Sequence, residues 1–234
     1  MKRFLVLAPA LLLVSLCSSQ TLDEIVNKSY AASGSELLDK AVTISVEGRA
    51  TQMGIEMPMV MLMKRPDKIK VTTTYNGMDI IVAYDGQKAY MVNPLMGATD
   101  PVELPQDQAS SLQKDNMFRN QLLDYFRAGK LVLSGEEDVN GKPAFKIMVS
   151  GDEGSPSYIF VDKESYLTVK TTATVIQMGQ EMEVETFINE YTDINGVKFP
   201  KVTASFVNGM EAGGMTFDKI EIDKPIEDSV FVIK

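Results

Sequence analysis

The hydrophobic positions of this chain follow two different periods, and strand-like segments far outnumber helical ones. Leu22, Ile25 and Val26 recur at helical spacing and share one face. This spacing predicts a helix over residues 22–32, followed by a short helix over 36–40. After these helices, the pattern changes to strict alternation of apolar and polar residues.

The alternating region predicts a sheet built from consecutive hairpins. Asn76-Gly77 and Asp85-Gly86 are dipeptides typical of tight hairpin turns. Because nearly every connection is this short, neighbouring strands should run antiparallel. We expect strands over 41–52, 55–64, 67–75, 78–85 and 88–93, and then over 130–139, 142–150, 156–163, 166–176, 181–192, 197–207 and 214–223.

A helical insert separates the two groups of strands. Residues 94–105 are rich in proline and glycine, which predicts a loop. The helical period then returns, with a polar segment over 106–115 and a helix with a wide apolar face over 116–128. A short extended piece over 228–234 ends the chain. Since helices do not alternate with strands, the pattern excludes a doubly wound α/β fold and predicts the α+β class.

One predicted strand, residues 55–64, reads IEMPMVMLMK and has an unusual composition. Its four methionines occupy every second position, so all four point to the same face of a strand. Methionine adapts its shape and is common on surfaces that accept varied apolar partners. Two interpretations are open from the spacing alone: the row lines a ligand cavity, or it fills an ordinary core beneath a helix. Pro58 removes a backbone donor, so the strand lies at an edge or bends there.

The residue types exclude the commonest catalytic and metal sites. The chain has no histidine, and its only cysteine is Cys17. A Ser-His-Asp triad, a thiol nucleophile in the exported chain and a His/Cys zinc site are therefore unavailable. The acidic runs 136–138 and 152–153 are typical of solvated turns rather than metal sites. We expect no enzyme, no metal and no cofactor, and the formal charge of −9 argues against a nucleic-acid partner.

Residues 1–19 have the pattern of a secretory signal peptide. A short basic start is followed by an apolar run from Phe4 to Leu16 and then by small polar residues. Cleavage after Ser19 would release a soluble periplasmic chain that forms a single domain over 20–234. The alternative is a lipobox ending at Cys17 with lipid attached there, although Leu16 is larger than the residue that usually precedes a lipidated cysteine. No later segment reaches the length of a membrane-spanning helix.

Three stretches, in their order along the chain, resemble the LolA/LolB-like family of exported outer-membrane lipoprotein-sorting proteins, and most closely its Bacteroidota branch. They are MGIEMPMVMLMKRPDKIKV (53–71), AYDGQKAYMVNPLMGATDPVELP (83–105) and ETFINEYTDINGVKFP (185–200). The resemblance implies a strongly curved antiparallel sheet that forms an incomplete β-barrel, with helices covering a concave apolar cavity. It also implies a monomeric carrier of lipoprotein acyl chains or other lipids. The alternative is a protein-binding or envelope-sensing module on the same scaffold, with an envelope protein as partner.

The resemblance and the methionine row together predict a cavity lining. The methionines should face the concave side beneath the 116–128 helix, with Val60 and Leu62 on the other face. The family closes its helical lid with an arginine that bonds to lid-helix backbone, and Arg49 and Arg65 are the strand arginines available for this role here. The predicted lining residues are Met57, Met59, Met61, Met63, Ile69, Val71, Ile80, Val82, Met117, Leu122, Tyr125 and Phe126.

Overall fold

The computed structural model describes residues 20–114, 116–150, 157–177 and 180–233. The predicted signal peptide, its cleavage site and Cys17 lie outside the described residues. Within them, none of the helices has the length and apolar character needed to cross a membrane.

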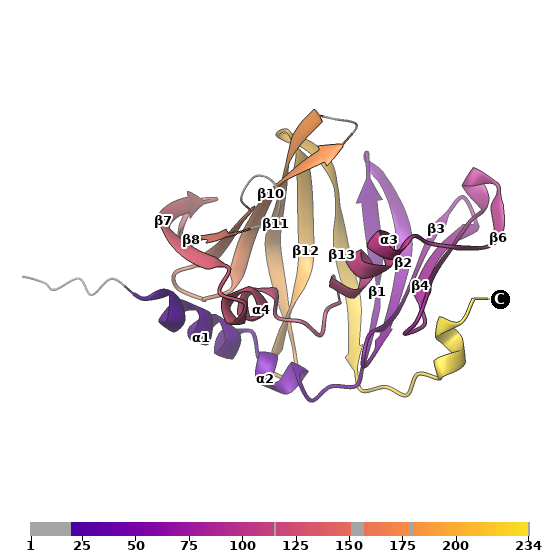
Figure 1. Cartoon of the computed structure of the whole chain (residues 1–234), viewed down its shortest axis with the longest axis horizontal. Helices are drawn as coiled ribbons and strands as arrows, with labels where there is room; N and C mark the ends of the chain where they lie inside the picture. Colours follow the sequence, from indigo (N-terminus) through magenta and orange to yellow (C-terminus); the bar gives the residue numbers. More distant parts are fainter. Residues whose placement is uncertain (1–19, 115, 151–156, 178–179, 234) are drawn as a thin grey trace, which may run out of the picture.

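One antiparallel sheet forms most of the fold (Figure 1). Among the described residues it has 13 strands in the order β6-β5-β4-β3-β2-β1-β13-β12-β11-β10-β9-β8-β7. The sheet curves strongly but does not close, because β6 and β7 remain as its two edges. The expected α+β incomplete barrel is therefore confirmed. The strands are β1 (Thr43–Gln52), β2 (Ile55–Lys64), β3 (Lys68–Tyr75), β4 (Met78–Tyr84), β5 (Ala89–Asn93), β6 (Ala98–Glu103), β7 (Leu131–Val139), β8 (Lys142–Val149), β9 (Ser157–Asp162), β10 (Thr168–Gln177), β11 (Gln180–Ile194), β12 (Val197–Val207) and β13 (Met210–Ile222).

The helices cover one end of the concave face. Helix α1 begins at a capping box, in which Thr21 and Glu24 bond to each other's backbone N–H groups. Figure 1 shows α1 and α2 at the lower end of the sheet, with α4 and α3 in front of it. The helices are α1 (Leu22–Ala32), α2 (Ser35–Leu38), α3 (Gln106–Lys114) and α4 (Gln121–Arg127), with 3₁₀ turns η1 (Pro94–Met96) and η2 (Asp228–Phe231).

The β1–β2 register fixes which side the methionine row faces. Met63, Met61, Met59 and Met57 stand opposite Ile44, Val46, Gly48 and Ala50 of β1. Directly opposed residues of an antiparallel pair point to the same face, and that face carries the buried core. Val60 is exposed on the other face, and Leu62 lies half-buried on that same face. The alternation expected from the sequence is therefore present.

Two apolar clusters fill the space between sheet and helices. The first contains Met59, Met63, Ile44 and Val46 and packs against Phe118. The second contains Ile25 and Val26 of α1, Leu122 of α4 and inward residues of β7, β8 and β9. The helical cover therefore consists of two parts over separate patches of the sheet.

Glycines allow the sheet to bend where β1, β13 and β12 meet. A Cβ atom at Gly48 or Gly213 would lie 2.2 Å from a carbonyl oxygen of the neighbouring strand, and one at Gly214 would lie 2.3 Å from Thr203 O. Register shifts between Glu47 and Gly48 and between Ser205 and Phe206 mark bulges nearby. Bulges and glycines are the usual means of curving a sheet, and here they occur at its centre.

Three predictions near the insert and the C-terminus are wrong. Residues 94–105 are not a simple loop, because they contain β6. Pro101 is tolerated there since β6 is an edge strand, where a missing N–H breaks no ladder on the open side. Strand β13 begins at Met210 rather than 214, and the expected extended piece over 228–234 contains the 3₁₀ turn η2.

The predicted helix over 116–128 is also too long. Asn116 is buried and its Oδ1 accepts the N–H of Phe118, which forms a local turn instead of a helical start. Helix α4 begins only after Asn120, whose Oδ1 accepts the Leu123 N–H at 2.9 Å. The two asparagines therefore favour a turn and a helix N-cap, and they override the apolar spacing.

Candidate functional site

The end of the concave face away from the helices contains a cavity of about 680 Å³. It opens beside the β1–β2, β3–β4 and β12–β13 turns, at the opposite end of the sheet from α2 (Figure 1). Its volume is in the range of pockets that hold small organic ligands. Its lining is Ala50, Thr51, Gln52, Met57, Thr73, Ile80, Thr186, Thr203, Ser205, Ala212, Gly213, Gly214 and Met215.

The cavity has one apolar wall, built by β2, β3 and β4. Met57 and Ile80 belong to the lining, and Met61, Val71 and Val82 continue the same face toward the core by register. All five side chains are only half-buried. The apolar surface therefore runs without a change of face from the closed core beneath the helices to the open end of the sheet.

The facing wall, built by β11, β12 and β13, carries hydroxyl groups and glycines. Thr186 Oγ1 and Ser205 Oγ lie 3.2 Å apart, and the Thr203 hydroxyl accepts the Met215 N–H at 3.2 Å. Gly213 and Gly214 have no side chains, so bare backbone lines the cavity at these two positions. This wall was not predicted, although the alternating hydroxyls of residues 201–205 and the Gly-Gly pair in the sequence are its signal.

The structure divides the predicted lining residues into three groups. Met57 and Ile80 line the cavity, and Met61, Val71 and Val82 continue its apolar wall. Met59, Met63 and Ile69 lie on the same face but are buried in the core cluster. Met117 packs at the edge of this cluster, and the remaining three predicted residues lie elsewhere: Leu122 and Phe126 in the α1 cluster, and Tyr125 with 36% of its surface exposed.

The prediction that the 116–128 helix lies over the methionines holds only for Met117 and Phe118, which precede α4 and pack on the core cluster. Helix α3 provides that cover through Ala109 and Leu112, and Phe118 of the connecting segment joins it. Helix α4 instead packs on α1 and the β7–β9 end of the sheet. The error arose because α3 is mostly polar, and only two of its side chains mark the inward face.

Arg65, at the end of β2, connects the sheet to the helical cover. Its Nε donates to the carbonyl of Ala41 at 2.7 Å and its Nη2 to that of Leu38, at the end of α2, at 3.1 Å. The guanidinium also stacks 4.5 Å above the Phe118 ring. Arg49 has no such role, since it pairs with Glu56 and Asp218 on the opposite face.

Replacing Arg65 by alanine should loosen the helical cover. Two carbonyls would lose a charged donor and Phe118 its stacking partner, which we expect to cost roughly 2–3 kcal/mol. For a chain of this size the unfolding midpoint should fall by roughly 4–12 °C. Arg65→Lys is the control for charge, because lysine keeps the charge but cannot stack or bond to both carbonyls in the same way. Equal midpoints for Arg65→Ala and the unmodified protein in a thermal melt would refute this role.

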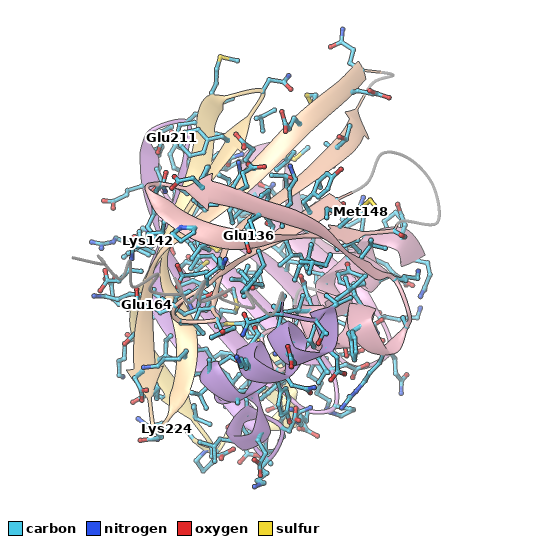
Figure 2. All side chains as sticks on the ribbon, turned by 90° about the vertical axis from the view of Figure 1, so that its left-hand side faces the viewer. Glu136, Lys142, Met148, Glu164, Glu211 and Lys224 are labelled. Atoms are coloured by element: carbon cyan, nitrogen blue, oxygen red, sulfur yellow. The ribbon has the colours of Figure 1, made fainter. Side chains whose placement is uncertain are left out.

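Methionines also mark the open rim of the cavity. Met53 and Met210, at the β1–β2 and β12–β13 turns, are 86% and 72% exposed, and Met96 next to β5 is 78% exposed. Figure 2 shows Glu211 toward this end of the molecule and Lys224 at the opposite end. The rim thus combines exposed apolar side chains with neighbouring carboxylates.

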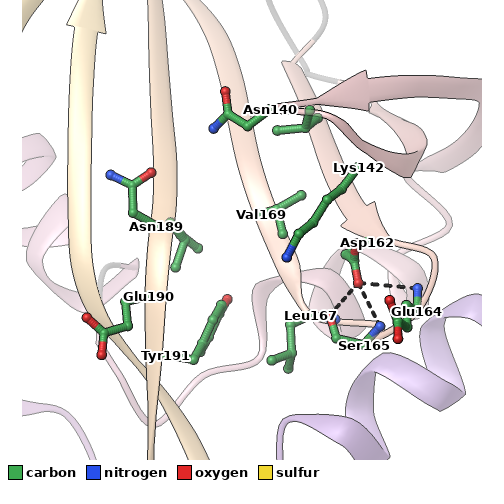
Figure 3. A pocket seen from close by; sticks show the side chains of 12 residues that line it. Asn140, Lys142, Asp162, Glu164, Ser165, Leu167, Val169, Asn189, Glu190 and Tyr191 are labelled. Carbon is green, nitrogen blue, oxygen red and sulfur yellow. Dashed lines mark hydrogen bonds between the residues drawn. The ribbon is translucent and has the colours of Figure 1, made fainter.

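A second cavity, of about 650 Å³, lies on the other face of the sheet beside the β9–β10 turn. Figure 3 shows Lys142, Asn189 and Tyr191 around it. Strand β10 pairs with β11 only from Lys170 onward. Before Lys170 the two strands separate, and the Tyr191 hydroxyl bridges this gap by donating to the carbonyl of Thr168 at 2.7 Å. Burial raises the pKa of the Tyr191 phenol. The phenol therefore stays neutral and closes the gap in the sheet.

Asp162 organises the turn beside this second cavity (Figure 3). The carboxylate is buried, and its Oδ1 accepts the Ser165 N–H at 2.6 Å, the Ser165 hydroxyl at 2.7 Å and the Glu164 N–H at 3.2 Å. Burial pushes the pKa of Asp162 upward, but the three donors outweigh burial and hold that pKa below its usual value.

Asp162→Ala should destabilise the protein by roughly 2 kcal/mol at neutral pH, because three donors lose their acceptor. A depressed folded-state pKa stabilises the protein above the unfolded pKa, and this contribution is lost as the pH falls through the folded value. The difference in unfolding free energy between the unmodified protein and Asp162→Ala should therefore shrink in acid. Asp162→Asn keeps an acceptor without a charge, so its loss at neutral pH should be smaller, and this loss should also shrink in acid, because only the unmodified protein loses the contribution of a carboxylate there. Urea unfolding at neutral and acidic pH measures all three, and a gap that widens in acid contradicts the assignment.

Among the described residues, no group of three or more aspartates, glutamates, cysteines or histidines has a geometry suited to a metal ion. The acidic run at 152–153 lies outside those residues, while Glu136 and Glu137 pair with Lys163 and Lys146. Glu136 and Glu137 therefore form surface ion pairs.

Comparison with known proteins relates the fold to solved structures. No protein-family model matches the chain, and no curated protein matches it significantly in sequence. A DUF1329 family protein from Desulfovibrio piger is 13% identical with a TM-score of 0.62, over 89% of this chain and 97% of that one. A LolA superfamily protein from Nitrosomonas europaea is 12% identical with a TM-score of 0.58, over 92% and 98%.

A third solved structure is a proposed outer-membrane lipoprotein-sorting domain from Vibrio parahaemolyticus. It is 10% identical to this chain with a TM-score of 0.60, over 90% of this chain and 97% of that one. At this level of identity the likeness concerns the fold alone. The chain has the open, curved, helix-covered antiparallel sheet that it shares with the LolA superfamily and DUF1329 structures.

Proposed function

We propose that this protein binds acyl chains of lipoproteins or other lipids in the concave cavity and carries them through the periplasm. The observation that supports this most is the apolar wall, which runs from the core beneath α3 to the open end of the sheet. A wall that serves only as core should be covered along its whole length. Here the part that includes Met57 and Ile80 faces a cavity.

The size and chemistry of this wall suit an acyl chain. Met57 and Met61, the two half-buried methionines of this row, stand four residues apart, or roughly 13 Å, comparable with half of a hydrocarbon core about 30 Å thick. Each buried CH₂ group contributes about 0.8 kcal/mol, so a long chain gains about 10 kcal/mol before ordering costs. The flexible thioethers can adapt to chains of different length or branching.

The fold similarity and the sequence support the cellular setting of this proposal. A chain exported by residues 1–19, cleaved near Ser19 and monomeric in the periplasm would meet lipids of both membranes. Membership of the Bacteroidota branch and attachment through Cys17 are separate predictions. Comparison with the sequences of relatives tests membership of the branch. The mass of the mature N-terminal peptide tests attachment of lipid to Cys17.

Native mass spectrometry of protein isolated from a cell envelope tests the binding function. We expect a lipid-sized mass that is lost on organic extraction and identified in the extract. As a control, Ala50→Trp places a large side chain in the cavity from near the end of β1 and should yield mostly empty protein. Protein that is always empty, and takes up no lipid from mixed vesicles, would refute the proposal.

A second candidate function is a protein-binding or envelope-sensing module. It is favoured by the exposed rim methionines Met53, Met96 and Met210, since such side chains suit variable protein contacts. Replacing these three by serine discriminates the two functions. If the protein is a sensing module, the triple variant should lose a stoichiometric envelope partner, and neither it nor the unmodified protein should contain lipid. If the protein is a carrier, the triple variant should keep its bound lipid.

A further inference from the structure

The lining of the cavity is apolar on one side and uncharged but polar on the other. None of the described residues that line it has an ionisable side chain. Its polar groups are the hydroxyls of Thr51, Thr73, Thr186, Thr203 and Ser205 and the amide of Gln52. A ligand in this cavity therefore meets hydrogen-bonding groups but no counter-charge.

The hydroxyls of the β11–β12 wall have bonding capacity left for a ligand. Thr186 and Ser205 lie on adjacent strands in direct register, and a single hydrogen bond of 3.2 Å joins their hydroxyls. One of the two hydroxyl protons is used in that bond, so the other is free to donate. Thr203 accepts from Met215 N–H and keeps its own proton for a second bond.

The charges around the mouth are negative. Glu56 and Asp79 follow the alternation of β2 and β4 and lie on the outer face, one residue away from the lining residues Met57 and Ile80. The surrounding hairpin ends, residues 50–57, 74–80, 174–177, 180–183 and 206–212, contain no lysine or arginine. Arg49, the cation near Glu56, is already paired with Glu56 and Asp218.

We propose that the cavity selects amphiphiles whose chain carries an uncharged hydrogen-bonding group, such as an ester or amide, and rejects anionic ones such as free fatty acids. This selectivity rests on the proposed lipid-binding function. The chain lies along Met57, Met61 and Ile80, and the carbonyl or hydroxyl of the ligand accepts or donates at Thr186, Ser205 and Thr203. Ester and amide groups match these partners with one or two hydrogen bonds.

An ionised carboxylate has no such match. Moving it into the cavity costs several kcal/mol unless a cation or several donors compensate, and the described lining offers no cation. Keeping the carboxylate in water would instead hold the chain outward and expose part of it. It would also place the charge beside the rim carboxylates, which repel it over a Debye length of about 10 Å.

Two ligands that differ in charge but hardly in size test the proposal: dodecanamide and dodecanoate. Both are titrated in competition with a fluorescent lipid at about pH 8, where the acid is ionised. We expect the amide to bind at least about tenfold more tightly. Equal affinities, or tighter binding of dodecanoate, would overturn the selectivity and leave the lipid-binding function intact. Failure of both ligands and of the fluorescent lipid to bind would refute the binding function itself.

Variants test whether the hydroxyls of the wall built by β11, β12 and β13 cause the selectivity. Thr186→Val combined with Ser205→Ala should weaken amide binding about fivefold and leave dodecanoate nearly unchanged. Thr72→Val, on the outer face of β3, is the matched control and should change neither affinity. Thr203→Lys adds a cation to the wall and should reverse the preference in favour of dodecanoate. A preference that survives both the double variant and Thr203→Lys would overturn the assignment to this wall.

Discussion

Replacing Ile80 by glutamate should weaken lipid binding by at least about tenfold, whereas the same change at the next residue, Ile81, should leave it nearly unchanged. Ile80 lines the cavity, while Ile81 points to the opposite face of β4. The two side chains start with the same chemistry and similar partial burial. A difference in lipid affinity between Ile80→Glu and Ile81→Glu therefore depends only on which face of the sheet carries the glutamate.

Equilibrium titration with a fluorescent lipid, together with a thermal melt of each variant, measures this effect. The melt separates a loss of binding from a loss of folding. Equal binding by Ile80→Glu and Ile81→Glu, with both variants folded, would show that lipid does not enter the concave cavity.

Gly214→Val should be among the most destabilising single changes in the chain. Its Cβ would lie 2.3 Å from Thr203 O, a backbone atom held in the β12–β13 ladder. Relief requires a shift of one strand, so we expect a cost of roughly 3 kcal/mol or more. The unfolding midpoint should fall by roughly 6–12 °C.

Ala212→Val is the matched control, because this position on the same strand already has a Cβ atom. It should cost less than about 1 kcal/mol. If Gly214→Val and Ala212→Val have the same unfolding midpoint, the bend where β1, β13 and β12 meet does not depend on Gly214.

The strand pattern of this fold was largely readable in the sequence. Period-two alternation and Asn-Gly or Asp-Gly turns are local signals, and short hairpins determine neighbouring strands without long-range information. The direction of the methionine row followed from the same alternation, since a strand has only two faces. These features depend on residues close together in the chain.

Features that depend on contacts between distant residues were missed. Helix α3 packs on the cluster that contains Met59 and Met63 although most of its residues are polar, because Ala109 and Leu112 face inward. The apolar face of 116–128 correctly suggested burial, but nothing local distinguishes one end of the sheet from the other. Asn116 and Asn120 acted as turn and cap residues, which the apolar spacing concealed.

The site itself was predicted on one wall only. Hydrophobic residues on β2–β4 drew attention because they are unusual, whereas threonines, serine and glycines on β11–β13 are common strand and turn residues. Their role depends on the curvature that brings β12 and β13 opposite β2–β4. That curvature arises from bulges and glycines and is not visible as a periodic pattern.

Photo-crosslinking with a lipid that carries a diazirine in its acyl chain tests the central claim most directly. Peptide mapping by mass spectrometry locates the labelled residues in the unmodified protein. We predict labels on the inward residues of β2–β4 and β11–β13, including Met57, Ile80 and Met215, and their loss when unlabelled lipid competes. Labels confined to the outer face, for example at Val60 and Ile81, or labels that do not respond to competition, would contradict a lipid-binding cavity.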